Sequence, residues 1–313
     1  MTNTHKPFLA IALCAIFCVV VGCWPGFPGW PTDLWPDAAA KPVGLVQLIE
    51  FHNIQGLRNW AHELEERGLK SLVFVQKNIL EAHSTEIKWL SDAGHEIAGG
   101  HAEDAFWDVE YETQFAIMSE TKELVEEITG RPMRVFGSRY FAYDENTLAA
   151  ADALGVEYVL ARGTSDVEAI IYVPDEYDCK IISVSNVTFE DMGRGSLCDY
   201  SLWARGATAE EFGEALDDAI AKHPKRIMFA THTYLGGMKA TWWEQYRRLL
   251  DSDEIRWAAD FDEWASPESG VNIRVPLRQV PADREVTYTT PTPSEPLDEL
   301  DDVDWMHNPC GAP

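Results

Sequence analysis

Short apolar segments alternate with amphipathic segments through the middle of the 313-residue chain, and this alternation restricts its fold more than any other feature. The apolar segments have the length of buried strands, and the amphipathic ones carry apolar residues at helical spacing. Strands are expected at 43–51, 71–75, 96–98, 134–137, 156–161, 170–173, 180–184, 226–231 and 255–259, and helices at 55–67, 84–92, 113–129, 145–154, 208–221 and 241–250. Such alternation predicts an α/β fold with a mostly parallel sheet, open or closed into a barrel.

Both ends of the chain differ in composition from the middle. Residues 1–22 combine a positive start with a short apolar run, which predicts a lipoprotein signal ending before Cys23, the residue that would carry the lipid. An ordinary signal peptide or a short membrane anchor is the alternative. A Pro- and Trp-rich spacer follows at 23–42, the expected domain covers 43–266, and an extended acidic tail is expected at 267–313. We therefore expect an exported protein of the cell envelope that contacts a membrane only through its lipid.

The charge balance excludes several partners. The chain has 25 Lys and Arg residues against 52 Asp and Glu, a formal charge of −27. Such a chain repels nucleic acid phosphates, and a strongly anionic polymer is a poor candidate substrate for the same reason. No glycine-rich phosphate loop is present, so no nucleotide cofactor is expected. In an oxidising compartment, Cys179 and Cys198 are predicted to form a disulfide.

Three histidines follow predicted strands: His52, His101 and His232. Because the carboxyl ends of parallel strands meet at one edge of a sheet, these side chains are expected to converge there. Imidazoles together with a carboxylate form the open kind of Zn²⁺ site that activates water for hydrolysis. The sequence therefore predicts a hydrolytic metal site at this edge.

Three segments give the domain a family resemblance. The segments GHEIAGGH at 94–101 and GRPMRVFGSRYFAYDENTL at 130–148, followed by LGVEYVLA at 154–161, resemble the polysaccharide deacetylase family, carbohydrate esterase family four. The resemblance covers roughly residues 43–266. It implies a distorted (β/α) barrel that removes acetyl groups from a glycan with the help of a divalent metal.

The family's catalytic motifs are only partly kept in this chain. Where the family has Thr-Phe-Asp-Asp, residues 50–53 read Glu-Phe-His-Asn, and Ala105 occupies the position of the family's second metal-binding histidine. His101 and the late His232 are kept. The Arg-Pro-Pro-Tyr motif aligns with residues 137–140, with the tyrosine kept at Tyr140 and the arginine displaced to Arg139.

Two interpretations of the altered motifs remain open. In the first, His52 and His101 bind the metal, which the resemblance implies to be Zn²⁺, with Glu103 or Asp104 as the acidic partner. His232 is then a third ligand or the general acid, and Glu50 or Asp104 is the base. The second is an inactive glycan-binding or structural lipoprotein. The candidate residues for holding the acetylated glycan are Asn53, Trp107, Arg139, Tyr140 and Tyr234.

Overall fold

The computed structural model describes residues 40–50, 54–107, 109–162, 167–189 and 193–281. The predictions on Cys23, His52 and Asn53, on the signal, and on most of the spacer and tail fall outside these residues. The strands are β1 (Val43–Glu50), β2 (Ser71–Gln76), β3 (Glu96–His101), β4 (Val135–Ser138), β5 (Tyr158–Ala161), β6 (Ile170–Pro174), β7 (Lys180–Ser183), β8 (Asn186–Phe189), β9 (Gly193–Ser196), β10 (Arg226–His232), β11 (Arg256–Trp257) and β12 (Asn272–Val275). The α-helices are α1 (Gln55–Glu66), α2 (Lys77–Ala82), α3 (Ser84–Asp92), α4 (Tyr111–Thr129), α5 (Glu145–Leu154), α6 (Asp199–Trp203), α7 (Ala209–Ala221), α8 (Thr233–Gly236), α9 (Ala240–Leu250) and α10 (Phe261–Ala265), with 3₁₀ turns η2 (Arg139–Phe141) and η3 (Leu277–Gln279).

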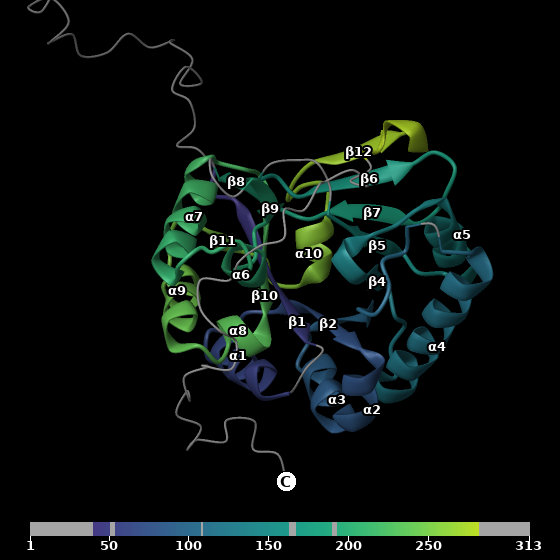
Figure 1. Ribbon diagram of the computed structural model, residues 1–313, viewed down its shortest axis with the longest axis horizontal. Coiled ribbons are helices and arrows are strands. Elements are labelled where there is room, and N and C mark those ends of the chain that lie inside the picture. The colour runs from purple at the N-terminus through teal and green to yellow at the C-terminus, as the bar shows by residue number, and fades with distance from the viewer. Residues whose placement is uncertain (1–39, 51–53, 108, 163–166, 190–192, 282–313) are drawn as a thin grey trace, which may run out of the picture. The chain divides into compact units, whose positions relative to one another are not determined.

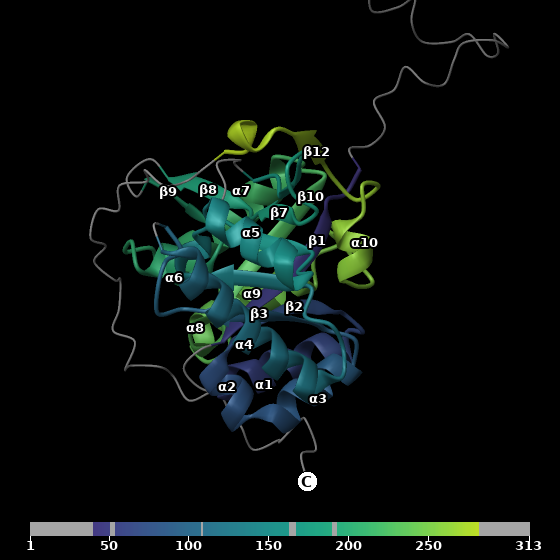
Figure 2. The ribbon, with the colours of Figure 1, turned by 90° about the vertical axis from the view of Figure 1, so that its right-hand side faces the viewer.

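Ten of the described strands form one curled sheet. Its order is β10-β1-β2-β3-β4-β5-β7-β6-β12, with β11 beside β1. Neighbouring strands run parallel except β6 and β7, which are antiparallel. Most helices lie around the outside of the sheet, whereas α10 lies in the middle of the ring of strands in Figure 1. The two views show how far the sheet curls (Figures 1 and 2). The predicted fold is confirmed: this is a distorted (β/α) barrel of mostly parallel strands.

The sequence of β1 explains its central position. All eight of its residues are buried, because helices cover the sheet on one face and the barrel interior fills the other. Val46 and Leu48 belong to the core between the sheet and the outer helices, where Trp60 of α1 is completely buried. Val43 and Leu45 belong to the second core, inside the barrel. Successive side chains of a strand point to opposite faces, so one apolar strand supplies both cores.

Each of the six predicted helices starts within two residues of its predicted position, whereas α2, α6, α8 and α10 are not predicted. At α7, Thr208 accepts a hydrogen bond from the backbone N–H of Glu211, whose carboxylate accepts one from the backbone N–H of Thr208. These reciprocal bonds form a capping box. None of the helices in the described parts of the chain is both long enough and apolar enough to cross a membrane.

The domain extends further than expected. β12 lies in the segment predicted to be an extended tail, yet it pairs in parallel with β6 from Asn272 opposite Ile171 to Val275 opposite Pro174. The expected boundary at residue 266 is therefore too early. No strand or helix is predicted between residues 184 and 208, yet this segment forms the hairpin β8–β9 and the helix α6. Both elements are short and weakly patterned, which is why periodicity does not reveal them.

One buried histidine makes stability depend on pH. The Nδ1 atom of His95 accepts hydrogen bonds from the backbone N–H of Ser71, at 3.1 Å, and from its hydroxyl, at 2.8 Å. Burial lowers the pKa of His95 from 6.5 to about 3. The folded protein therefore keeps this ring neutral while the unfolded chain binds a proton, so stability is lost as the pH falls from about 6.5 towards 3.

We expect His95→Asn to remove this pH dependence, because the Asn side-chain oxygen can accept the same bonds and does not titrate. Between pH 6.5 and pH 5 the wild type should lose about 2 kcal/mol of unfolding free energy more than the variant does. Urea denaturation at several pH values measures the difference. Parallel pH curves for the two proteins would contradict the assignment.

Candidate active site

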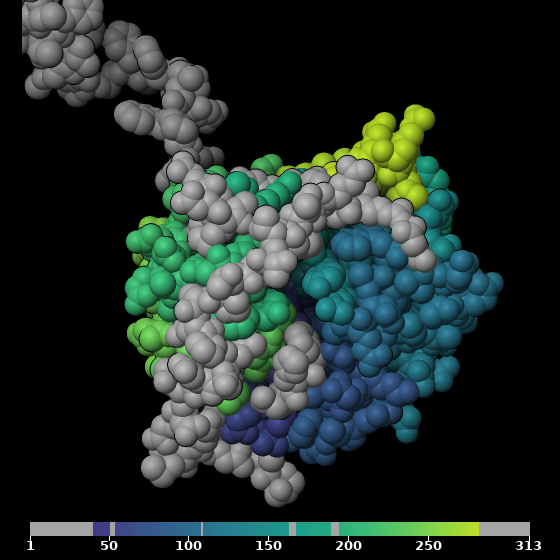
Figure 3. Space-filling model, in the orientation of Figure 1, coloured from purple at the N-terminus to yellow at the C-terminus, as the bar shows by residue number. Residues whose placement is uncertain are grey.

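A cavity of about 700 Å³ opens at the carboxyl edge of the parallel strands. Its lining includes Ile49 of β1, Phe74 of β2, Ser138 of β4 and His232 of β10. In the space-filling view, a hollow lies near the centre of the molecule between the green and the teal-to-blue surfaces (Figure 3). This is the edge at which ligands bind in α/β folds, and the volume suits a small ligand such as one or two sugar rings.

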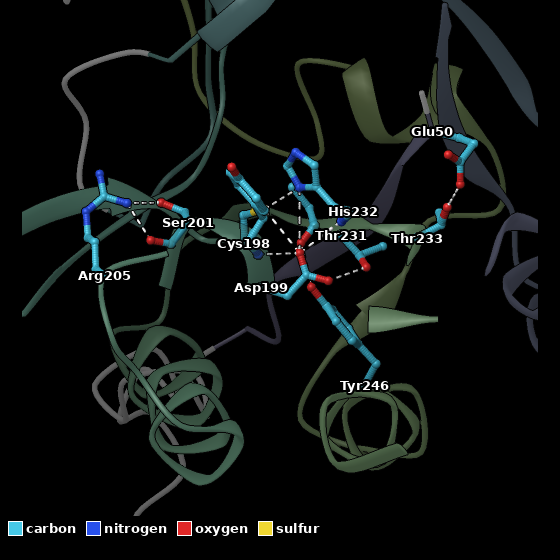
Figure 4. Close-up of polar contacts among 11 residues, drawn as sticks. Glu50, Cys198, Asp199, Ser201, Arg205, Thr231, His232, Thr233 and Tyr246 are labelled. Atoms are coloured by element: carbon cyan, nitrogen blue, oxygen red, sulfur yellow. Dashed lines mark hydrogen bonds and ion pairs between the residues drawn. The ribbon is translucent and has the colours of Figure 1, made fainter. Parts of the chain in front are cut away.

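Asp199 is the centre of the polar network on one side of this cavity. It is completely buried at the start of α6. Its Oδ1 accepts hydrogen bonds from the backbone N–H groups of Tyr200, at 2.6 Å, and His232, at 2.9 Å. Its Oδ2 accepts one from the hydroxyl of Thr231 at 2.7 Å (Figure 4). A carboxylate that accepts this many hydrogen bonds is fixed in place.

His232 faces the cavity from the end of β10 and is held from behind. Its Nδ1 lies 3.7 Å from Oδ1 of Asp199 and 3.2 Å from the sulfur of Cys198, whose thiol donates to the same Oδ1 at 3.3 Å. The ring of Tyr200 packs on the imidazole, with 4.6 Å between the ring centres. The carboxylate, the thiol and the tyrosine together orient the ring, so that Nε2 is the nitrogen turned away from Asp199 (Figure 4).

Sequence reasoning missed Asp199 and Cys198 as parts of this network. No local pattern singles out Asp199, and Cys198 is predicted only as half of a disulfide. Cys198, the residue before α6, pairs with Ala230 of β10 in an isolated β-bridge, which is a contact between distant parts of the chain. The local sequence carries no signal for it.

Several predicted glycan-binding residues do lie at the cavity. Arg139, Tyr140 and Tyr234 line it, as does Glu103. Tyr140 and the next residue, Phe141, have φ angles of 61° and 52°, a left-handed backbone that is strained for side chains of this size and is found most often at functional sites. Trp107 is not among the described lining residues, but its ring lies 5.9 Å from the guanidinium of Arg162, which does line the cavity.

Of the predicted metal ligands, His101 and Asp104 are the pair that the described residues bring into contact. Nε2 of His101 contacts Oδ2 of Asp104 at 3.3 Å, on the rim, while Glu103 is exposed. Among the described residues, one group of three possible ligands lies within 4.8 Å, and it is Cys198, Asp199 and His232 rather than the predicted set. His52, the third predicted ligand, lies outside the described residues.

The group at Cys198 has ligand types that suit Zn²⁺, but its arrangement does not fit one. The oxygens of Asp199 already accept bonds from Thr231, Tyr200, His232 and Cys198. Burial and the neighbouring carboxylate raise the pKa of the Cys198 thiol well above its usual range, whereas a metal needs the thiolate. The described residues therefore do not form the metal site that the family resemblance implies.

Glu50, predicted as a base, is placed away from the reacting region. It is completely buried and accepts a hydrogen bond from the hydroxyl of Thr233. The neighbouring Ile49 lines the cavity, and Glu50 is not among the described lining residues. Because alternate residues of a strand face opposite sides, Glu50 points behind the cavity wall (Figure 4).

The predicted disulfide between Cys179 and Cys198 is wrong: both cysteines are buried and unbridged. Cys179 precedes β7, where its thiol contacts the carbonyl of Leu148 in α5 at 3.7 Å. Cys198 lies beside Ala230, close to the carboxyl end of β10. The two thus lie near opposite ends of the parallel strands, so no disulfide can span them.

The fold and the cavity define an α/β half-barrel protein with a pocket at the carboxyl ends of its strands. Residues 57–159 match the family model described as polysaccharide deacetylase. This match agrees with the resemblance to that family that the motifs of the chain indicate. No curated protein matches the chain significantly.

Solved structures share this fold at low sequence identity. A candidate polysaccharide deacetylase from Mycobacterium smegmatis is 17% identical with a TM-score of 0.53, over 67% of this chain and 75% of its own. The allantoinase PuuE is 15% identical with a TM-score of 0.56, over 77% and 96%. A mutant of a Bacillus anthracis pseudoenzyme of carbohydrate esterase family 4 is 12% identical with a TM-score of 0.51, over 76% and 70%. At these identities the likenesses establish the fold alone.

Proposed function

We propose that this domain is a hydrolase that removes acetyl groups, N- or O-linked, from a glycan. The observation that carries the proposal is the imidazole of His232, held at the cavity by buried Asp199. A histidine oriented by a carboxylate is the most frequent proton-transfer device in hydrolysis. Its position at the carboxyl edge of a polysaccharide deacetylase fold supports the same reaction class. The lipid anchor at Cys23 and export to the cell envelope remain part of this proposal.

The cavity residues have distinct parts in the reaction. Water adds to the acetyl carbonyl carbon, and Glu103 accepts its proton from the rim. The guanidinium of Arg139, which donates to the backbone carbonyl of Glu103 at 3.1 Å, is close enough to the same region to stabilise the oxyanion. The bond to the sugar nitrogen or oxygen then breaks, and Nε2 of His232 gives the leaving group its proton. The products are acetate and a free amine or hydroxyl.

The proposal is tested by acetate release. Purified protein is incubated with N-acetylated chito-oligosaccharides and with acetylated xylan, and acetate is measured by an enzyme-coupled assay. His232→Asn should lower the rate by a factor on the order of 10²–10⁴. His62→Asn, on the outer helix α1, is the matched control and should keep the wild-type rate. Parallel assays after chelation, and with added Zn²⁺ or Co²⁺, determine whether the rate depends on a metal.

A non-catalytic glycan-binding protein is the second candidate. It is favoured by Ala105, which replaces a metal-binding histidine of the family, and by the incomplete ligand set among the described residues. On this hypothesis the wild type binds the same oligosaccharides but releases no acetate with or without metal, and His232→Asn binds as the wild type does. Release by the wild type that His232→Asn abolishes would eliminate this candidate.

A further inference from the structure

Three arginine side chains line the cavity, and they come from separate parts of the fold. Arg139 lies in η2 after β4, Arg162 follows β5, and Arg205 follows α6. Among the described lining residues, Glu103 is the single acidic side chain, and it is exposed. The protein as a whole has a formal charge of −27. The cavity therefore concentrates positive charge in a strongly acidic molecule.

Burial increases the effect of these charges. Arg162 is 7% exposed, and burial lowers the pKa of Arg205, as expected for a guanidinium removed from water. Arg205 is held by the carbonyl and the hydroxyl of Ser201, at the left in Figure 4. A guanidinium in such surroundings attracts an anion more strongly than one in open water, because the surrounding dielectric is lower. A bound anion also stabilises such a guanidinium more, because the guanidinium has lost its hydration.

Tyr140 brings two of the guanidinium groups together. The ring centre is 4.9 Å from the central carbon of Arg139 and 5.6 Å from that of Arg162. Cation–π contact holds both groups against one aromatic ring although they carry the same charge. The left-handed backbone at Tyr140 and Phe141, φ 61° and 52°, is what directs this ring, which is 48% exposed. Two arginines fixed side by side at a cavity wall form a receptor for an oxyanion.

We propose that the cavity binds a sugar unit bearing an oxyanion, a carboxylate or a phosphate, through Arg139, Arg162 and Arg205. This inference rests on the proposed function, whose substrate class it specifies. The oxyanion accepts hydrogen bonds from the guanidinium groups, while the rings of Tyr140 and Tyr200 pack against the sugar. The −27 charge of the whole molecule repels a long polyanion but acts weakly over distances beyond about 8 Å at physiological salt. The fitting ligand is thus a short or sparsely charged acidic glycan.

The test measures binding with a matched series of sugars. Glucose, glucuronic acid and glucose 6-phosphate share one ring and differ in the added carboxylate or phosphate. None carries an acetyl group, so the result does not depend on hydrolysis. Calorimetric titration of the purified protein should give at least tenfold tighter binding for one acidic sugar than for glucose. The tighter of the two acids identifies whether the oxyanion is a carboxylate or a phosphate.

The variants are Arg139→Gln and Arg162→Gln, with Arg131→Gln as the control because Arg131 is exposed and is not a lining residue. Each lining variant should weaken acid binding about tenfold and leave glucose binding unchanged, whereas the control should match the wild type. Arg139 is exposed, so its variant is expected to fold even if the Arg162 variant does not, and circular dichroism verifies this.

Equal affinity for all three sugars would overturn the inference, as would acid binding that Arg139→Gln leaves unchanged. If either result is found and the wild type still releases acetate, the proposed function stands and only the substrate class is wrong. If acid binding follows the arginines while no acetate is released from any substrate, the proposed function fails and the anionic subsite stands.

Discussion

Replacing Asp199 by asparagine should reduce acetate release by a factor on the order of 10²–10⁴ while leaving KM within about threefold. The change keeps the shape of the side chain but removes the charge that faces Nδ1 of His232 at 3.7 Å. It also replaces one carboxylate oxygen by an amide N–H₂, either the oxygen that accepts from Thr231 or the one that accepts from the backbone of Tyr200 and His232. Asp199 acts through His232 and is therefore a positioning residue. Steady-state kinetics on the acetylated oligosaccharides measure both parameters.

Two further variants separate positioning from general loss of structure. Asp218→Asn changes an exposed carboxylate of α7 that pairs with Lys222 at 3.0 Å, and both kinetic parameters should remain at the wild-type values. Cys198→Ser keeps a donor between the carboxylate and the imidazole, so it should retain most of the rate, whereas Cys198→Ala should not. If Asp199→Asn raised KM and left kcat unchanged, the pair would serve binding rather than proton transfer.

The second large effect concerns stability. Arg226→Met should lower the unfolding free energy by about 3–5 kcal/mol. The arginine is completely buried, and its guanidinium donates to the carbonyls of Trp264, at 2.7 Å, and Ser266, at 2.5 Å. It also donates to the carbonyl of Val271 at 3.3 Å and to the side-chain oxygen of Asn272 at 2.9 Å. Methionine fills similar space but leaves these acceptors buried without donors. Each unsatisfied acceptor then costs its full desolvation free energy.

This arginine lies where the sheet does not close by strand pairing. It starts β10, one end of the strand order, and reaches the segment that leads into β12, at the other end. Burial lowers the pKa of Arg226 to about 10, so it stays charged at neutral pH. Arg226→Lys, with fewer donors, should fall between the methionine variant and the wild type.

Denaturant titration followed by tryptophan fluorescence measures these differences. Arg248→Met is the matched control, because Arg248 is exposed and pairs with exposed Asp217 at 2.8 Å, an interaction that contributes about 0–1 kcal/mol. If Arg226→Met unfolded at the same denaturant concentration as the control, the closure of the barrel would rest on other contacts.

Most strands of the large sheet, the longer helices and the edge that carries the site could be predicted because they depend on local pattern. The apolar strand 43–51 and the capped helix at Thr208 are properties of a few neighbouring residues, and His232 follows from where its strand ends. The face of the sheet to which Glu50 points could not be predicted. In a strand buried on both faces, the pattern of polar and apolar residues does not distinguish one face from the other. Ile49 faces the cavity, and its neighbour therefore does not.

The partners of His232 and the charge of the cavity depend on contacts between distant segments. Asp199 reaches the histidine only after the chain has formed β8, β9 and the turn into α6, and the three arginines meet only when β4, β5 and α6 are in place. The net charge of the sequence pointed away from anionic ligands because it averages over the whole molecule. The cavity, a small part of that surface, has the opposite sign.

The pairing of β1 with β10 also determines when the site can exist. Val43 lies opposite Arg226, so the first strand acquires this neighbour only from residues about 180 positions later, a loop closure that makes assembly slow. A chain interrupted before residue 226 has no His232 and leaves the hydrogen-bonding edge of β1 exposed to other chains. Such fragments are expected to aggregate rather than to show partial activity. The amino-terminal strand, the first to be synthesised, is therefore among the last to be completed.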